Sequence, residues 1–435
     1  MLGMVEAKKI AVCPRHTERK LLLYNAMYLI MGITILYIGG GLHKSSPYVG
    51  LIIGLGSIIS FFLISYFWQI TGYRADHYLL PLVSILTSTG LIFLMRLEPQ
   101  YAFRQFVWLL VALITLAVVT TLLRNYYFLL EYTYIYALLG SIALVLPIFF
   151  GIEQGGSRSW LNFSLFQVQT SEFVKILLVL FLAGFLAENR RILATGNLVV
   201  LGIPLPNPRE WGPMIAMWGV GIVLLVFQRD LGTALIYFCT FLAMLYTATA
   251  RLLYIFFGFI MFLLSGFISY HLFSHVKARV DIWLNPWAYF ETTGYQLIQS
   301  LFAVGSGGLF GSGLGAGSPG LIPAVHTDFI FAAICEEMGL LGGCGIIVLF
   351  IILVYRGLKI SLQAKDDFST LVAVGLTALM TLQFFIIVAG VIKLLPLTGV
   401  TLPYISYGGS SLVANFIILG LLLNISHKAG LINEK

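Results

Sequence analysis

Charged side chains are scarce in this sequence. Asp, Glu, Lys and Arg together make up 10% of its 435 residues, whereas hydrophobic residues make up 59%. Soluble domains average about 25% charged residues, so a chain of this length has too little polar surface to cover a globule in water. The shortage of charge excludes a soluble enzyme and indicates a protein that crosses a membrane several times.

Cysteine is also rare, with four residues in the whole chain. Three of them, Cys239, Cys335 and Cys344, fall inside apolar runs, and Cys13 lies in the N-terminal tail. Thiols scattered in this way indicate neither a disulfide framework nor a zinc motif.

Acidic residues are fewer than basic ones, 18 against 25, which leaves a net charge of +7. Lys and Arg gather in the cytoplasmic loops of membrane proteins, and with the N-terminus in the cytoplasm most of them fall on such loops here. The basic excess therefore predicts a topology with both termini in the cytoplasm. This topology explains the positive charge without a nucleic-acid partner.

Apolar runs of about 20 residues are abundant, and this is the length of a helix that crosses the hydrocarbon core of a bilayer. The sequence predicts an all-α bundle of about twelve transmembrane helices. The approximate runs are 20–41, 48–70, 78–96, 105–123, 132–150, 172–188, 212–227, 230–249, 252–274, 329–355, 369–393 and 409–426.

We divide the chain into three parts. Residues 1–19 form a basic cytoplasmic tail, and the apolar run that follows is too long for a cleaved signal peptide, so it is interpreted as a signal anchor. Residues 20–150 have almost no charge inside their apolar runs and predict a membrane scaffold. Residues 151–435 carry the polar motifs and form a membrane core that includes an extracytoplasmic loop at 275–328.

Residues 276–337 are the one long interruption between the apolar runs. Their glycine series, Gly305 to Gly320, is neither a Rossmann nor a P-loop signal, because no strand precedes it and no Gly-Lys-Ser/Thr follows it. The series predicts either a close-packed loop or a backbone that a bulky headgroup can approach. His326 and Asp328 then open the tenth run.

Ionisable side chains also lie within the apolar runs. Glu172 and Lys175 are three residues apart on one helical face and predict a structural ion pair. Glu336 and Glu337 are adjacent inside a run, where charge is costly, so they are functional candidates with a partner expected nearby. Lys393 is one candidate for that partner.

Arg229 and Asp230 form a tight turn between the seventh and eighth runs. They predict either an ion pair that closes the helical hairpin or an arginine that Asp230 orients for an anion such as phosphate. The flexible external turn after the fifth run adds a second cation and an interfacial aromatic ring, Arg158 and Trp160.

The last external loop, residues 395–411, is rich in Pro, Gly and hydroxyl groups, Ser410 among them. Irregular backbone at a membrane edge is tolerated where it lines a cavity or is buried in protein. We therefore expect this loop to face the same site as the 276–337 interruption.

Together, the motifs between residues 150 and 426 resemble those of the SEDS family, the FtsW/RodA/SpoVE proteins of bacterial wall synthesis. The matching segments are GGSRSW, QTSEFVK, QRDLGTA, NPW followed by GYQLIQSLFAVGSGGLFGSGLG, HTDFIFAAICEEMG and LPLTGVTLPYISYGGSS. The resemblance implies a peptidoglycan glycosyltransferase that polymerises lipid II at the outer face of the bacterial cytoplasmic membrane. Its role would be in division, elongation or sporulation, beside a class B penicillin-binding protein.

The resemblance also implies roles for residues. A carboxylate would deprotonate the acceptor sugar hydroxyl, and cations, including Mg²⁺ or Mn²⁺, would offset the charge that grows on the departing undecaprenyl pyrophosphate. No other cofactor is implied. The residues assigned to substrate binding are Arg158, Trp160, Arg229, Gln296, Ser300, His326, Asp328, Lys393 and Ser410. Those assigned to a structural polar network are Glu172, Lys175, Asp230, Glu336 and Glu337.

One departure from the family pattern concerns the base. The family's second loop acid, usually regarded as catalytic, aligns with Tyr289, and a phenol of unperturbed pKa about 10 is a poor base at neutral pH. Glu291 or Asp281 is therefore predicted to act as the catalytic base. Two other hypotheses stay open: a non-catalytic scaffold for the penicillin-binding protein, and a flippase or transporter, because carriers also carry intramembrane carboxylates.

Overall fold

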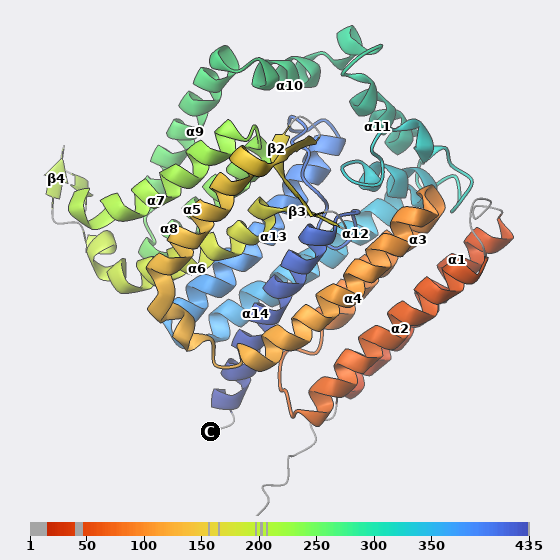
Figure 1. Ribbon diagram of the computed structural model, residues 1–435, viewed down its shortest axis with the longest axis horizontal. Coiled ribbons are helices and arrows are strands. Elements are labelled where there is room, and N and C mark those ends of the chain that lie inside the picture. The colour runs from red at the N-terminus through yellow and green to blue at the C-terminus, as the bar shows by residue number, and fades with distance from the viewer. Residues whose placement is uncertain are drawn as a thin grey trace, which may run out of the picture.

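The computed structural model describes residues 15–39, 47–154, 157–163, 166–195, 198–200, 203–205 and 208–433 (Figure 1). Most of the predicted tail, including Cys13, lies outside these residues.

Eleven helices in the described part of the chain are long and apolar enough to cross a membrane. They are α1 (His16–Ile38), α2 (Pro47–Ile70), α3 (Leu79–Leu97), α4 (Pro99–Leu122), α5 (Thr133–Phe150, preceded by the 3-10 helix Tyr126–Tyr132), α6 (Thr170–Thr195), α8 (Leu231–Thr249), α9 (Leu252–Leu272), α12 (Ile330–Gln363), α13 (Asp367–Val391) and α14 (Gly409–Asn433). The run expected at 212–227 lies in α7 (Pro208–Phe227), whose apolar part, Trp211–Phe227, is shorter. The predicted all-α membrane bundle is confirmed.

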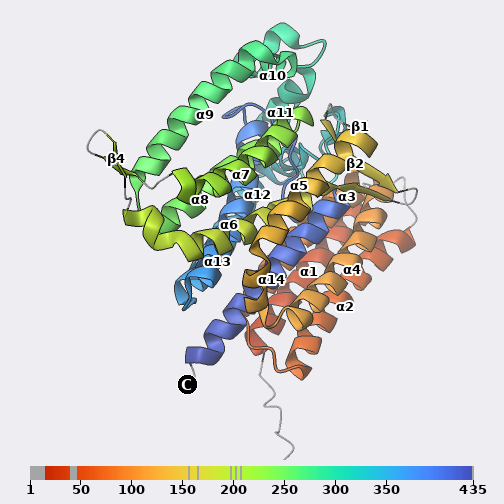
Figure 2. The same ribbon diagram turned by 60° about the vertical axis from the view of Figure 1, so that its left-hand side comes forward.

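Four helices, α3, α6, α13 and α14, form the centre of the bundle, and 72% to 83% of their apolar windows is buried. In α9 none of the window is buried, and Figure 2 shows this helix at the edge of the bundle. Since lipid tails are as apolar as Leu or Ile side chains, the exposed apolar surface of α9 fits contact with lipid.

Both ends of the described chain lie at the same end of the bundle. Arg15, just before α1, donates from Nη2 to the carbonyl oxygen of Tyr73 at 2.7 Å. The ring of Tyr73 stacks on His427 near the end of α14, with the ring centroids 4.6 Å apart. These contacts bring the start of α1 and the end of α14 together at one end of the bundle.

The segment after α5 is a small antiparallel sheet of β1 (Ile152–Gln154), β2 (Ser157–Phe163) and β3 (Phe166–Gln169), which differs from the flexible turn expected there. The sheet places Trp160 opposite both Ile152 and Gln169. The strands are too short to show a clear alternation of apolar and polar residues. Their stability comes from pairing with each other, which the sequence of a single strand does not reveal. A second hairpin, β4 (Leu198–Val200) with β5 (Ile203–Leu205), lies between α6 and α7.

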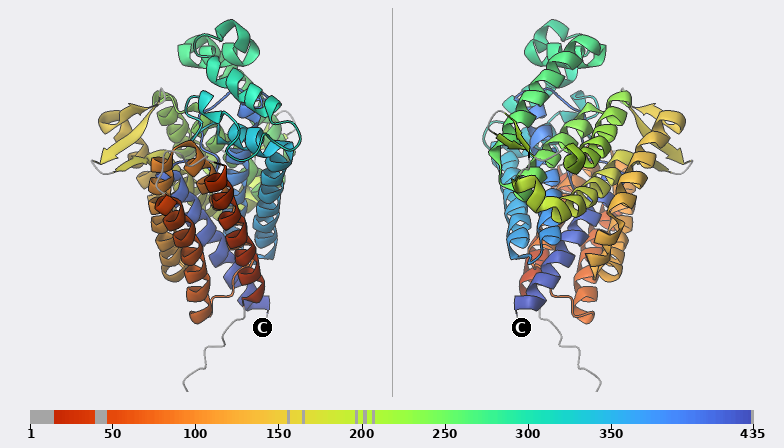
Figure 3. Two further views of the ribbon diagram at one scale, coloured as in Figure 1. Left: turned by 90° about the vertical axis from the view of Figure 1, so that its right-hand side faces the viewer. Right: turned by 90° about the vertical axis from the view of Figure 1, so that its left-hand side faces the viewer.

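The 276–337 interruption is largely helical. It contains α10 (Ser274–Leu284), the 3-10 helix Pro286–Tyr289, α11 (Tyr295–Ser306) and the 3-10 helix Pro319–Leu321. Figures 1 and 3 show α10 and α11 arching over the end of the bundle opposite the C-terminus. The Trp283 indole donates to the carbonyl oxygen of Lys393 at 3.1 Å, which ties the arch to the loop between α13 and α14.

That last loop packs directly on α3 at Gly90. A Cβ atom built on Gly90 would lie 2.3 Å from the carbonyl oxygen of Ile405, so a larger side chain cannot be accommodated unless the backbone moves. Small residues let backbone segments approach closely inside membrane proteins. Gly90 thereby sets the depth at which the 395–408 loop enters the bundle.

Candidate active site

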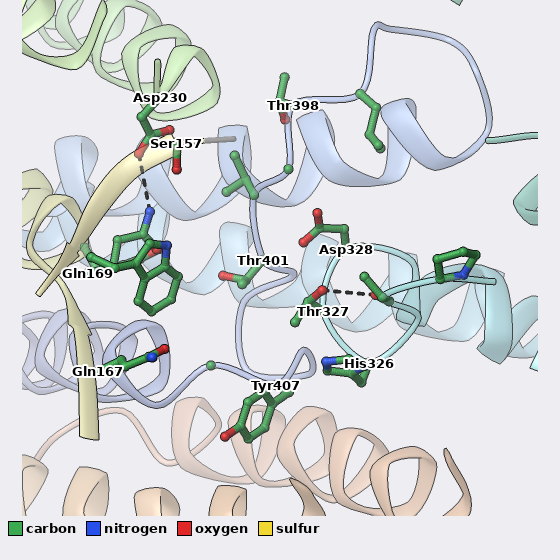
Figure 4. A pocket seen from close by; sticks show the side chains of 18 of the residues that line it. Ser157, Gln167, Gln169, Asp230, His326, Thr327, Asp328, Thr398, Thr401 and Tyr407 are labelled. Carbon is green, nitrogen blue, oxygen red and sulfur yellow. Dashed lines mark hydrogen bonds between the residues drawn. The ribbon is translucent and has the colours of Figure 1, made fainter. Parts of the chain in front are cut away.

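A cavity of about 1790 Å³ lies at the arch end of the bundle (Figure 4). Its walls come from segments far apart in the sequence: α4, β2, β3, the α7–α8 turn, α10, the start of α11, and the loops before α12 and α14. Small-molecule sites typically occupy about 300–1,000 Å³. The cavity is therefore large enough for a substrate bigger than an ordinary metabolite.

One wall of the cavity is charged. Arg229 and Asp230 come from the α7–α8 turn, Arg279 from α10 and Asp328 from the loop before α12. Arg279 donates from Nη1 to the carbonyl oxygen of Thr398 at 3.0 Å, so it bridges the arch and the last loop. Burial lowers the pKa of Arg279, while the nearby carboxylates of Asp230 and Asp328 act in the opposite direction.

Asp230 is held firmly in place. Its Oδ1 accepts the backbone N–H of Thr233 at 3.2 Å as the N-cap of α8, and its Oδ2 accepts Nε2 of Gln169 at 3.3 Å. Burial raises the pKa of Asp230. Arg229, with a φ of 59°, pairs with Glu153 at 3.7 Å and not with Asp230. The hairpin-closing ion pair is thus not formed in the structure, and Arg229 faces the cavity.

Glu172 and Lys175 form the ion pair expected from their spacing. Nζ of Lys175 lies 2.5 Å from Oε2 of Glu172 and donates to Oε1 of Gln383 at 2.9 Å. Gln383 in turn donates to the carbonyl oxygen of Thr401 at 2.9 Å. This buried chain of contacts fixes the last loop against α6 and α13.

The opposite side of the cavity is aromatic. Tyr101 stacks on His326, with the ring centroids 4.5 Å apart, and lies 4.7 Å from the ring of Tyr407. Trp108 meets Phe166 edge-to-face at 6.1 Å. Burial lowers the pKa of His326, so this imidazole is neutral at pH 7. Rings with polar tips combine apolar contact with hydrogen bonding, which fits the apolar faces and hydroxyl edges of sugars.

Glu336 and Glu337 do not line the cavity. Oε1 of Glu336 accepts the backbone N–H of Ser318 at 2.7 Å, and Oε2 of Glu337 accepts that of Gly315 at 3.0 Å. The other oxygen of Glu337 accepts Nε of Arg96 at 3.1 Å. The two acids hold the glycine series against α12, and this contact accounts for carboxylates inside a span.

The cavity brings together several of the predicted substrate-binding residues. Those that line it are Trp160, Arg229, Gln296, His326 and Asp328.

The remaining predicted substrate contacts lie outside the cavity lining. Arg158 is exposed and donates from Nε to the carbonyl oxygen of Gly151 at 3.0 Å. Ser300 is buried and donates to the carbonyl oxygen of Val391 at 3.1 Å. Ser410 accepts the backbone N–H of Gln169 at 3.4 Å. Lys393, expected beside the paired acids of α12, has no ion pair with them, and Arg96 is the partner of Glu337.

Neither predicted base contacts the cavity. Glu291 is exposed in the turn before α11. Asp281 accepts the hydroxyl of Tyr270 at 3.0 Å on the other side of α10, and Tyr289 is 37% exposed. A role for Glu291 or Asp281 as the base stays a prediction, and it requires the loop to move toward the cavity.

Several cavity residues were not assigned from the sequence. Tyr101, Arg104 and Trp108 line the cavity from α4, and their spacing of three and four residues, which defines one helical face, could have revealed them. Gln169 lies in the matching segment QTSEFVK, but no role was assigned to it. Arg279 lacked a local signal, because its contacts are with residues about 120 positions later.

Comparison with known proteins places this arrangement in a family. The model of the family described as "Cell cycle protein", for FtsW, RodA and SpoVE, matches residues 73–430. The chain belongs to the FtsW/RodA/SpoVE family. The match extends well before residue 150, where the motifs begin, and it leaves α1 and α2 outside it.

Named members of the FtsW/RodA/SpoVE family are similar over most of their length. "Peptidoglycan glycosyltransferase RodA" of Mycobacterium tuberculosis is 40% identical over 367 residues, covering 81% of this chain and 78% of the relative. "Stage V sporulation protein E" of Bacillus subtilis is 38% identical over 289 residues, covering 66% and 75%. "Probable peptidoglycan glycosyltransferase FtsW" of Geobacter sulfurreducens is 36% identical over 301 residues, covering 66% and 76%.

Solved structures of the family share the fold. One, described as "Structural coordination of polymerization and crosslinking by a peptidoglycan synthase complex", has a TM-score of 0.69 at 25% identity and covers 82% of this chain and 98% of that one. The crystal structure of the Thermus thermophilus rod shape determining protein RodA has a TM-score of 0.57 at 25% identity and covers 82% and 97%. The family and the spanning helices identify a multi-pass protein of the bacterial inner membrane.

Proposed function

We propose that this chain is a peptidoglycan glycosyltransferase that polymerises lipid II at the outer face of the membrane, with both of its termini in the cytoplasm. The observation that carries the proposal is the cavity, which combines an aromatic side with a charged wall at the arch end of the bundle. Relatives at 36% to 40% identity named as peptidoglycan glycosyltransferases support it.

In this proposal the two sides of the cavity bind different parts of the substrate. The rings of Tyr101, Trp108 and Trp160 contact the sugars, while Arg229 and Arg279 bind the pyrophosphate. Arginine forms forked, charge-assisted hydrogen bonds with phosphate oxygens. Both guanidinium groups then offset the negative charge that develops as the glycosidic bond to pyrophosphate breaks.

A divalent cation, Mg²⁺ or Mn²⁺, fits this proposal if the phosphates of the substrate supply some of its ligands. No group of three or more His, Cys, Asp or Glu side chains that could hold a metal occurs among the described residues. Mg²⁺ usually binds through one or two carboxylates together with substrate phosphates. Asp230, beside Arg229 in the cavity, is the carboxylate that would hold it, and the cation would supply further charge stabilisation for the leaving group.

A class B penicillin-binding protein is the proposed partner. The description of one similar structure as a complex that coordinates polymerization and crosslinking supports this pairing. A non-catalytic scaffold for the same partner is the second candidate function. The motif resemblance, in which Tyr289 aligns with the family's loop acid, favours it.

The test is polymerisation of purified lipid II by the purified chain, with its penicillin-binding protein present and Mg²⁺ or Mn²⁺ added. We expect glycan strands on a gel and release of undecaprenyl pyrophosphate. Arg279→Gln should reduce both, whereas Arg190→Gln is the matched control, because Arg190 pairs with exposed Asp367 away from the cavity.

Three results separate the candidate functions. A stable complex with the partner that makes no polymer under any of these conditions favours the scaffold. Movement of labelled lipid II across a liposome membrane without polymer favours a flippase. Polymer formation by wild type and its loss in Arg279→Gln support the glycosyltransferase.

A further inference from the structure

Among the described residues, three carboxylates line the cavity, and two of them already contact other protein groups. Glu172 lies 2.5 Å from the ammonium of Lys175. Asp230 caps α8 through the N–H of Thr233 and also accepts from Gln169. Oε2 of Glu172 is held by the ammonium, and each oxygen of Asp230 already accepts a hydrogen bond, so a proton from a substrate would compete with these contacts.

The third carboxylate, Asp328, is different. Within the described residues no Lys or Arg nitrogen lies within 4 Å of it. The neighbouring Thr327 hydroxyl donates to the carbonyl oxygen of Ala324 at 3.0 Å. The nearest cation, Arg279, uses Nη1 for the carbonyl oxygens of Leu397 and Thr398. Asp328 therefore faces the cavity with carboxylate oxygens that can accept a hydrogen bond or a proton from a substrate (Figure 4).

A glycine keeps the space beside this carboxylate open. Gly399 has a φ of +72°, and a Cβ built on it would lie 3.5 Å from Oδ2 of Asp328 and 4.0 Å from Nη2 of Arg279. The acid and the guanidinium thus flank one small gap in the cavity wall, next to the last loop. A hydroxyl and a phosphate held in adjoining positions there would meet a base and a cation respectively.

We propose that Asp328 is the general base of the transfer reaction, an assignment that rests on the proposed function. A carboxylate oxygen of Asp328 takes the proton of the acceptor sugar hydroxyl, and the hydroxyl oxygen forms a bond to the anomeric carbon of the donor. The bond from that carbon to the pyrophosphate oxygen breaks, and its electron pair leaves on the pyrophosphate beside Arg279. Asp328 then releases its proton to water through the open cavity.

The electrostatics of the site agree with this role. Burial raises the pKa of Asp328 to about 6, against the lowering effects of Thr327 and Arg279. A base whose pKa lies just below the working pH is deprotonated and still able to hold a proton in the transition state. The charged groups around it are Arg279 from α10 and, beyond it, Asp230 from the α7–α8 turn, while neutral His326 is on its own loop.

The test compares isosteric variants in the lipid II polymerisation assay with the partner present. Asp328→Asn should lower the rate about 10²- to 10⁴-fold, the usual contribution of a general base, while lipid II binding is retained. Asp328→Glu, which keeps a carboxylate, should recover part of the rate. Asp367→Asn is the matched control, since Asp367 is half exposed and pairs with Arg190 away from the cavity.

The wild-type pH profile provides a second measurement that does not depend on how a variant folds. The rate should fall about tenfold per pH unit below pH 6, because the protonated carboxyl cannot act as a base. The inflection should stay near pH 6 in His326→Gln, since Asp328 and not the imidazole sets it. A rate that does not change between pH 5 and pH 7 overturns the assignment.

The possible results separate a failure of the base assignment from a failure of the proposed glycosyltransferase function. If wild type makes no polymer, the proposed function fails and the base assignment fails with it. If wild type makes polymer and Asp328→Asn keeps more than about a tenth of the rate, only the base assignment is wrong. If Asp328→Asn is active and polymer is lost in Glu291→Gln or Asp281→Asn, that loop carboxylate is the base.

Discussion

Arg96 at the end of α3 and Glu337 inside α12 form an ion pair, with Nε and Oε1 3.1 Å apart, although 241 residues separate them in the chain. Arg96 also donates from Nη2 to the carbonyl oxygen of Gly317 at 3.0 Å. The pair therefore clamps the glycine series between two helices. The Glu337 side chain is fully buried, whereas Arg96 is 22% exposed.

Glu337→Gln should destabilise the protein by about 2–3 kcal/mol, near the lower end of the usual effect of breaking a buried pair because Arg96 is partly solvated. The measurement is thermal unfolding in detergent. A double-mutant cycle with Arg96→Gln should show a coupling energy, since the residues are in contact. Effects that simply add would mean that the pair contributes nothing.

Lys175→Met should be more damaging than the double variant Lys175→Met with Glu172→Gln. Both side chains are under a tenth exposed, so removing the ammonium leaves a buried, uncompensated carboxylate, which costs about 3–5 kcal/mol. Removing both charges avoids that cost. Unfolding midpoints of wild type, single and double variants compare the two cases, and a double variant as unstable as the single would contradict the argument.

Gly399→Ala should reduce polymerisation more than it reduces stability. Its φ of +72° strains an alanine by about 1–2 kcal/mol, and the added methyl group would enter the gap between Asp328 and Arg279. Gly320→Ala is the matched control, because a Cβ there meets nothing within 4 Å. Equal loss of activity in both variants would show that the gap has no special role.

Asp328→Asn should stabilise the fold at neutral pH. Folding raises the pKa of Asp328 from 3.8 to about 6, so the folded state favours the protonated acid. The contribution of Asp328 to stability is present below about pH 4 and is lost as the pH rises to 6. A shift of this size corresponds to about 3 kcal/mol, which we reduce to about 1–2 kcal/mol because the side chain is open to the cavity.

The gain for Asp328→Asn should therefore appear at pH 7 and vanish at pH 4. Unfolding of wild type and variant at the two pH values checks the sign. An asparagine variant that is less stable than wild type at pH 7 would mean that the charged carboxylate stabilises the fold.

The bundle and its general site could be predicted because they depend on local signals. Runs of 20 apolar residues specify membrane helices regardless of what surrounds them, and the spacing of Glu172 and Lys175 specifies an ion pair within one helix. The motifs around Arg229 and His326 likewise pointed to the arch end of the bundle. Each of these features is set by residues close together in the chain.

The identity of the charged groups that share the cavity is not a local property. Only the tertiary structure decides that Arg279 reaches Thr398, that Arg96 and not Lys393 pairs with Glu337, and that Asp328 faces the cavity while Glu291 faces outward. Sequence spacing cannot reveal these contacts, because they depend on how α10 arches over the last loop. The sequence by itself determined a membrane bundle with a polar end, and packing decided which carboxylates line its cavity.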